Sequence, residues 1–262
     1  MHTHSEFSLD STCPIIDMAN AQKKMGTNIF AVTDHFDLPY YKARNSIDSI
    51  LACYEEIDKT NVDGIEIIKG IEMSEIQWDY PETKRIIKKI NPDVVIGSVH
   101  SILFKGEISI HLRDFKKLTE AELDEFLHLY FSEVYKTARC GCDIIGHLTL
   151  PLRYLASKFN IFIDLNNYKD DIDKILKYII ENNIALEINT SALKTGLKDF
   201  LPDKEIIKRY LDMGGKMLTL GSDAHICENA SYGFDKAKEM LNSLGVFEAY
   251  YFKNRQPIKY EL

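Results

Sequence analysis

The chain has 262 residues, of which 45% are hydrophobic and 27% charged, a balance typical of compact globular proteins rather than disordered or fibrous ones. Its formal net charge of -8 argues against the basic surface that nucleic acids and anionic membranes require, so we expect neither as a partner. We find no run of about 18 apolar residues and no signal-peptide pattern, and therefore expect a cytoplasmic protein.

Strand-like and helix-like patterns alternate along the chain without an intervening linker, so we expect a single domain comprising residues 1–262. After a short first strand around residues 2–4, apolar runs of strand length occupy residues 28–33, 64–71, 93–100, 143–146, 184–189 and 216–221. Helical spacing or helix-start signals follow Pro14, Ser46, Pro81, Thr119, Asp171 and Asp203. This alternation predicts a parallel sheet with helices, either closed as a barrel or open.

Six of the eight histidines stand at or just after the carboxyl ends of the predicted strands: His2, His4, His35, His100, His147 and His225. Asp10, Glu72 and Asp223 accompany them. In a barrel all strand ends of this polarity meet on one face, whereas an open sheet could not bring so many together. Imidazoles and carboxylates in this number suit Zn, Mn or Fe and exceed what one tetrahedral ion needs, so we expect a multinuclear metal site.

The remaining histidines and the cysteines do not fit this pattern. His111 and His128 lie away from strand ends, and we expect them to be structural or solvated. Five scattered cysteines without a secretory signal predict free thiols rather than disulfides: Cys13, Cys53, Cys140, Cys142 and Cys227.

The ordered motifs resemble those of the PHP (polymerase and histidinol phosphatase) superfamily, and most closely its monofunctional histidinol-phosphate phosphatases. The resemblance spans His2 to His225 and is carried by His2-Thr3-His4, Asp10, Thr33-Asp34-His35, Gly70-Ile71-Glu72, Gly97-Ser98-Val99-His100-Ser101, Gly146-His147, Glu187-Ile188-Asn189-Thr190-Ser191 and Gly221-Ser222-Asp223-Ala224-His225.

The resemblance implies a distorted (β/α)7 barrel, similar to a TIM barrel, that holds three divalent metal ions. The implied ligands are His2, His4, Glu72 and Asp223 for the first ion, Glu72, His100 and His147 for the second, and Asp10, His35 and His225 for the third. Asp10 stands where some family members have a histidine.

The resemblance also implies a metal-dependent phosphomonoesterase that hydrolyses L-histidinol phosphate to L-histidinol and inorganic phosphate in histidine biosynthesis. A hydroxide between two ions would attack phosphorus in this reaction. We expect catalytic roles for Glu72, Asp223, His225 and Arg153, and substrate contacts from Arg153, Lys194 and His35. The carboxylates of Asp34 and Glu187 are expected to orient metal ligands, although Glu187 could instead point to the outside of the barrel. Trp78 either covers the site or packs in its loop.

Three alternatives stay open. One is a phosphoesterase of the same superfamily that acts on another phosphomonoester, such as a nucleotide or phosphotyrosine. Another is an amidohydrolase, although no strand end offers the carbamylated lysine that many of those enzymes use. The third is a catalytically silent metal-binding module, which commonly lacks some ligands, whereas every expected position here is filled.

Overall fold

The computed structural model describes residues 1–110 and 118–262, so His111 lies outside the described residues. Its main sheet is a parallel one in which six strands follow one another in chain order. They are β1 (Ile29–Val32), β3 (Glu66–Ser74), β4 (Val94–Ser98), β7 (Ile144–Ile145), β8 (Ala185–Asn189) and β9 (Leu218–Gly221). The short strand β2 (His35–Asp37) extends the line of β1 and also pairs with β3. Each strand run predicted after the N-terminal segment is therefore confirmed.

The N-terminal segment lies between the two edge strands of this curled sheet. Thr3 forms a parallel bridge with Ala224 just beyond β9, and on its other side its carbonyl accepts from Thr33 N at 2.8 Å. The α/β barrel expected from the sequence is thus confirmed. The predicted first strand is reduced to this single bridge residue, because the chain turns directly afterwards, where Ser8 N donates to Ser5 O at 2.9 Å.

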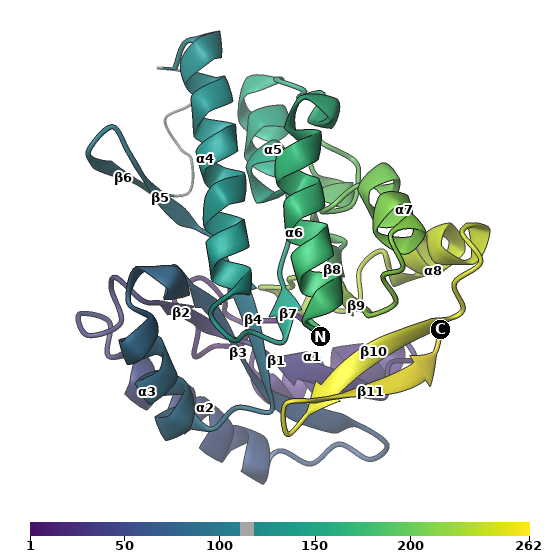
Figure 1. Ribbon diagram of the computed structural model, residues 1–262. Coiled ribbons are helices and arrows are strands. Elements are labelled where there is room, and N and C mark those ends of the chain that lie inside the picture. Colours follow the sequence, from purple (N-terminus) through teal and green to yellow (C-terminus); the bar gives the residue numbers. More distant parts are fainter. Residues whose placement is uncertain (111–117) are drawn as a thin grey trace.

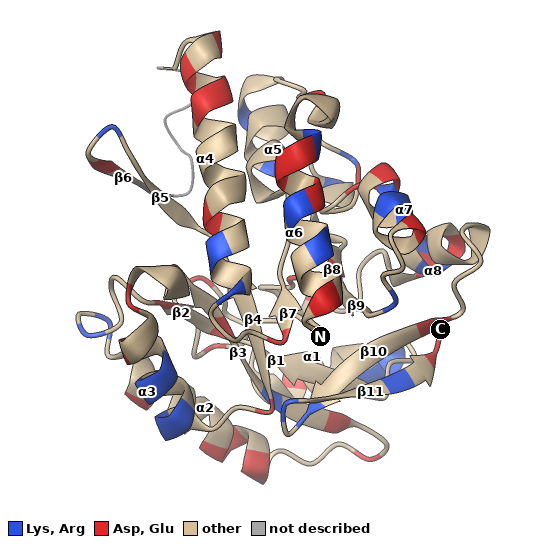
Figure 2. Cartoon of the chain, viewed as in Figure 1, with Lys and Arg blue, Asp and Glu red and all other residues tan. Residues whose placement is uncertain are grey.

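Helices surround the central strands (Figure 1). They are α1 (Ile15–Lys24), α2 (Ser46–Lys59), α3 (Tyr80–Ile90), α4 (Glu120–Ala138), α5 (Leu150–Tyr154), α6 (Lys169–Glu181), α7 (Lys204–Asp212) and α8 (Phe234–Ser243). The predicted capping box of α4 is present, since Thr119 and Glu122 each accept from the backbone of the other. Acidic and basic side chains intermix along α6 and α7 (Figure 2).

Two antiparallel hairpins, the strand β2, the helices α5 and α8 and the short helices were not predicted. The hairpin of β5 (Ser101–Phe104) and β6 (Glu107–Ile110) projects from the body (Figure 1). A second hairpin, of β10 (Glu248–Lys253) and β11 (Gln256–Glu261), ends the chain. The short helices are η1 (Ile76–Trp78), η3 (Leu155–Phe159), η4 (Leu165–Tyr168), η5 (Ser191–Lys194) and η6 (Cys227–Asn229).

The barrel interior has its own small apolar core, distinct from the large one under the helices. It comprises Ala31, Ile68, Val94, Ile96, Ile144, Ala185 and, from the C-terminal hairpin, Phe252. Successive side chains of a strand alternate between faces. Glu72 therefore shares the interior face of β3 with Ile68, and Glu187 shares the interior face of β8 with Ala185. Inside the barrel, the carboxylates of Glu72 and Glu187 therefore lie next to the apolar core, on the side of the carboxyl ends of the strands.

Candidate metal centre

Nine side chains predicted as metal ligands converge in three groups at the carboxyl ends of the strands. In the first group, His4 Nε2 lies 3.2 Å from Asp223 Oδ1, and His2 Nε2 lies 3.4 Å from Glu72 Oε2. The cross distances, His2 to Asp223 and His4 to Glu72, are both 3.7 Å between the same atoms. Four donor atoms from the N-terminal segment, β3 and the end of β9 therefore face one point.

The second group uses the other oxygen of Glu72. Its Oε1 lies 2.8 Å from His147 Nε2 and 3.1 Å from His100 Nε2, and the two imidazole nitrogens are 3.4 Å apart. Glu72 is completely buried. Because its two oxygens face different sets of imidazoles, this carboxylate is shared between the first and second groups.

The third group is the most open. Asp10 Oδ2 lies 3.4 Å from Nε2 of both His35 and His225, and these two nitrogens are 3.3 Å apart. His35 also approaches Glu72, with Nδ1 2.7 Å from Oε2. The third group therefore adjoins the first through His35.

Unsatisfied polar atoms show that these residues suit a cation. Within the described parts of the chain, His2 Nε2, His4 Nε2 and Glu72 Oε2 are buried and have no well-directed hydrogen bond. A buried polar atom without a partner costs about 1–3 kcal/mol. Imidazole nitrogen with carboxylate oxygen is the donor set of Zn, Mn and Fe sites. A metal ion would satisfy these atoms, so the residues fit one.

The charges of the groups depend on each other. Burial alone would raise the pKa of Glu72, but the imidazoles of His100, His2 and His35 outweigh it and hold that pKa well below its usual range. Burial would lower the pKa of His35, yet the carboxylates of Glu72 and Asp10 raise it to about 10. A cation that binds at His35 would therefore compete with a proton on that imidazole.

The backbone at the strand ends adopts uncommon conformations. Asp223 has φ 50° and His147 has φ 20°, although neither is glycine. Such residues are uncommon and gather at functional sites, where the surrounding structure holds them.

Glu187 supports two of the predicted ligands from inside the barrel. Its Oε1 lies 2.7 Å from His2 Nδ1, and its Oε2 accepts from the backbone N of His147 at 2.6 Å. The end of β9, which faces Glu187, has no room for a side chain, because a Cβ on Gly221 would lie 1.9 Å from Glu187 Oε1. Glu187 therefore points to the ligands and not to the outside of the barrel.

Asp34 accepts hydrogen bonds from the residue after His4 rather than from an imidazole ring. Its two carboxylate oxygens accept from the backbone N and the Oγ of Ser5, both at 2.6 Å. Burial raises the pKa of Asp34 to about 6, while the hydrogen bonds from Ser5 oppose that rise. It thereby fixes the turn that follows His4.

Two of the three predicted substrate contacts, Arg153 and Lys194, come from segments that follow β7 and β8. Arg153 Nη1 donates to Ser191 Oγ at 2.8 Å and to Asp223 Oδ2 at 3.2 Å, and Nη2 donates to the hydroxyl of Tyr154 at 3.1 Å. The Lys194 ammonium lies 5.2 Å from the ring centroid of Tyr232. Partial burial lowers the pKa of Lys194, although Asp223 opposes this. The guanidinium of Arg153 therefore lies at one edge of the first group, and Lys194 carries a charge that responds to Asp223.

Other residues singled out in the sequence lie away from the centre. Trp78 Nε1 donates to Glu133 Oε2 at 3.4 Å, so this ring packs toward α4. His128 is exposed, with Nδ1 2.5 Å from Asp171 Oδ2, as expected of a histidine outside the site.

Sequence reasoning missed Asp37 and Glu75. Asp37 Oδ1 lies 3.4 Å from His100 Nδ1, and Glu75 accepts from the backbone N of His100 at 2.7 Å. Asp37 follows His35 by two positions on a strand, the same spacing as His2 and His4, and that spacing could have identified it.

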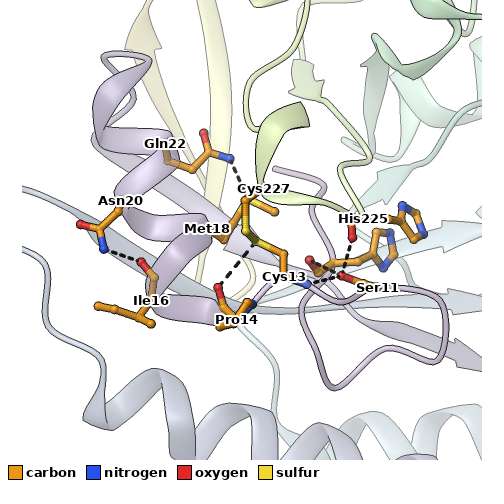
Figure 3. The surroundings of a disulfide bond; sticks show 10 residues. Ser11, Cys13, Pro14, Ile16, Met18, Asn20, Gln22, His225 and Cys227 are labelled. Atoms are coloured by element: carbon orange, nitrogen blue, oxygen red, sulfur yellow. Dashed lines mark hydrogen bonds between the residues drawn. A yellow bond between two sulfur atoms is a disulfide. The ribbon is translucent and has the colours of Figure 1, made fainter.

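The prediction of five free thiols was wrong for two cysteines. Cys13 and Cys227 form a disulfide with a Cα–Cα distance of 5.4 Å, next to the start of α1 (Figure 3). They are 214 residues apart in the chain, so only the fold brings them together. The other three cysteines are free and buried, as predicted: Cys53, Cys140 and Cys142.

A parallel α/β barrel with histidines and carboxylates gathered at the carboxyl ends of its strands defines a protein of the metal-dependent hydrolase type. Residues 1–191 match the PHP domain family, and the chain belongs to that family.

Two bacterial proteins of comparable length are similar to this chain. A Clostridium acetobutylicum protein named probable histidinol-phosphatase is 30% identical over 260 residues, with 96% of each chain covered. A Thermotoga maritima protein of the same name is 30% identical over 243 residues, covering 92% of this chain and 90% of its own.

A solved structure has the same fold. It is the histidinol phosphate phosphatase of Lactococcus lactis, crystallised with Zn, L-histidinol and phosphate. The TM-score is 0.73 at 22% identity, and the match covers 98% of this chain and 97% of that one. Within the described residues, no helix is long and apolar enough to cross a membrane.

Proposed function

We propose that the protein is a metal-dependent phosphomonoesterase that hydrolyses L-histidinol phosphate to L-histidinol and inorganic phosphate. The observation that carries the proposal is the convergence of nine imidazole and carboxylate side chains into three adjoining groups. The two relatives named probable histidinol-phosphatase support the choice of substrate.

Each group would hold one divalent ion, Zn, Mn or Fe. His2, His4, Glu72 and Asp223 would hold the first, Glu72, His100 and His147 the second, and Asp10, His35 and His225 the third. When bound, such ions would lower the pKa of a water molecule and neutralise charge on the phosphoryl group.

The protein's own groups would orient the reactants. Glu187 would accept a hydrogen bond from Nδ1–H of His2 and so leave the Nε2 lone pair free to face the first group. The planar guanidinium of Arg153 matches phosphoryl oxygens, and Ser191 and Tyr154 hold it in place. Lys194 would add a second positive charge at the same edge. His35 and His225 line the more exposed third group, where substrate would enter.

We also propose that residues 1–262 form one domain, which the packing of Phe252 into the interior core supports, and that the protein acts in the cytoplasm. Disulfides are rare in the cytoplasm. Alkylation and mass spectrometry of cell extracts, which report whether Cys13 and Cys227 are oxidised or reduced, therefore test the proposed compartment.

One preparation tests the function. Protein purified without chelator is analysed for metal content and assayed on histidinol phosphate, a nucleoside monophosphate and phosphotyrosine, with chelator-stripped protein as the control. We expect bound metal and the highest kcat/KM on histidinol phosphate. A higher kcat/KM on another ester would reassign the substrate.

The same assays address the other classes. Absence of turnover on every ester by metal-loaded protein would favour a silent metal-binding module. The nine converging donors include no lysine, which argues against a carbamylated-lysine amidohydrolase.

A further inference from the structure

The His100 imidazole lies between two carboxylates. Its Nε2 is 3.1 Å from Glu72 Oε1, in the second group, and its Nδ1 is 3.4 Å from Asp37 Oδ1. Asp37 comes from the end of β2, while His100 follows β4. The two ring nitrogens therefore face different acidic partners, one inside the proposed metal centre and one behind it.

Asp37 is held on both of its oxygens. Ser74 Oγ donates to Oδ1 at 2.7 Å, and Arg44 Nη1 donates to Oδ2. The pairing of β2 with β3 places Asp37 opposite Ser74, so sheet register fixes the carboxylate. The side chain of Asp37 is 12% exposed, which limits competition from water.

The backbone of His100 is fixed independently. Glu75 Oε1 accepts from the backbone N of His100 at 2.7 Å and from that of Ser101 at 2.8 Å. Ser74 Oγ contacts the other oxygen of Glu75 at 2.6 Å. With the main chain anchored, the contacts of the two ring nitrogens contribute to the orientation of the imidazole, together with its ring contacts to His35 and His147.

We propose that Asp37 is a positioning residue of the metal centre, which accepts a hydrogen bond from Nδ1–H of His100 and keeps the Nε2 lone pair directed at the second group. Arg44 keeps Asp37 in place by pairing with its outer oxygen. The inference rests on the proposed function, because it takes His100 as a metal ligand. A carboxylate behind a ligating histidine fixes its tautomer and strengthens it as a ligand.

The test compares Asp37→Ala and Asp37→Asn with native protein in zinc titrations against a chromophoric chelator. We expect Asp37→Ala to weaken one zinc site by about 10–100-fold without changing the number of ions bound at saturation. Asp37→Asn retains an oxygen acceptor and should recover part of this loss. Nitrogen-15 spectra of labelled histidines should show the Nδ1-protonated form of His100 in native protein and its loss in Asp37→Ala.

A matched control is Asp143→Ala. Asp143 also pairs with an arginine, Arg255, and its side chain is 10% exposed, but it lies at the opposite end of its strand from His147. This variant should lose stability without changing zinc affinity or the His100 signal.

The outcomes separate the two proposals. Native zinc affinity in Asp37→Ala overturns the positioning role and leaves the proposed function intact. Loss of a whole ion at saturation also overturns it, because Asp37 would then be a ligand itself, in the group that it forms with His35 and His100. Native protein that binds no zinc, manganese or iron refutes the proposed function and, with it, this inference.

Discussion

The carboxylate of Glu72 faces two groups of imidazoles at once, one with each oxygen. It is fully buried, and its Oε2 has no hydrogen-bond partner within the described residues. Glu187 also contacts residues of both groups, but its oxygens meet His2 Nδ1 and the backbone N of His147 rather than the imidazole nitrogens that face the centre. If the proposed centre is correct, Glu72 links two ions.

We therefore expect Glu72→Gln to reduce affinity at both the first and second sites. Glutamine has one acceptor oxygen and an NH2 group that only donates, so it cannot serve two cations. The metal affinity should fall by more than the loss of about 10–100-fold that is typical when a residue that only supports a ligand is removed. Elemental analysis and kcat/KM on histidinol phosphate measure the effect, with Glu133→Gln on α4 as the control. Full activity of Glu72→Gln would contradict the bridging role.

At the scale of the element, the end of β9 must come close to β8. A Cβ on Gly221 would meet Glu187 Oε1 at 1.9 Å and His2 Cβ at 2.7 Å. Glycine is thus required here for close approach, and the strand spacing positions Glu187 against His2.

Gly221→Ala should therefore displace Glu187 and weaken the first metal site by about 10–100-fold, the range for lost supporting contacts. Overpacking should also cost about 1–3 kcal/mol of stability. Gly214→Ala is the control, because Gly214 has φ +92 and no atom within 4 Å of its Cβ position. It should lose stability with unchanged zinc affinity. Equal zinc affinity in both variants would show that Gly221 does not position Glu187.

The disulfide joins the two loops that carry Asp10 and His225. Cys13 lies three positions after Asp10 and Cys227 two after His225. Ser11 Oγ, beside Cys13, donates to the carbonyl of His225 at 2.9 Å (Figure 3). The bond therefore restrains the relative positions of two members of the third group.

In the double variant Cys13→Ser with Cys227→Ser, we expect the free energy of unfolding to fall by about 2–4 kcal/mol, because a cross-link over so long a loop constrains the unfolded chain. The double variant should also lose more metal affinity at the third site than at the first and second sites. Urea denaturation with and without dithiothreitol measures the first effect. Reductant should destabilise native protein and Cys140→Ser but not the double variant; equal sensitivity in all three would contradict a structural disulfide.

At the scale of the whole molecule, the sequence predicted what depends on periodicity and order. Apolar runs ending in histidine or carboxylate located the strands, and their common polarity predicted the gathering of His4, Glu72 and His225. It could not predict contacts that depend on tertiary distance. Cys13 and Cys227 meet only because the N-terminal segment lies beside β9. The spacing of Asp37 from His35 indicates the face on which Asp37 lies, but not its contact with His100, which depends on β2 and β4 flanking β3.

The C-terminal hairpin was also not predicted from the sequence, and its packing gives a last prediction. Phe252 is 2% exposed and packs in the barrel interior with Ala31, Ile68 and Ile144. Phe252→Ala should therefore lower the free energy of unfolding by about 3–5 kcal/mol, the usual cost of emptying a buried aromatic site. Phe247, which is 63% exposed, supplies the matched control, and Phe247→Ala should change stability by no more than about 0.5 kcal/mol. Thermal and urea unfolding of both variants, with the metal centre loaded, measures the difference. If Phe252→Ala were as stable as Phe247→Ala, the hairpin would be an appendage, and residues 1–262 would not form the single domain that we propose.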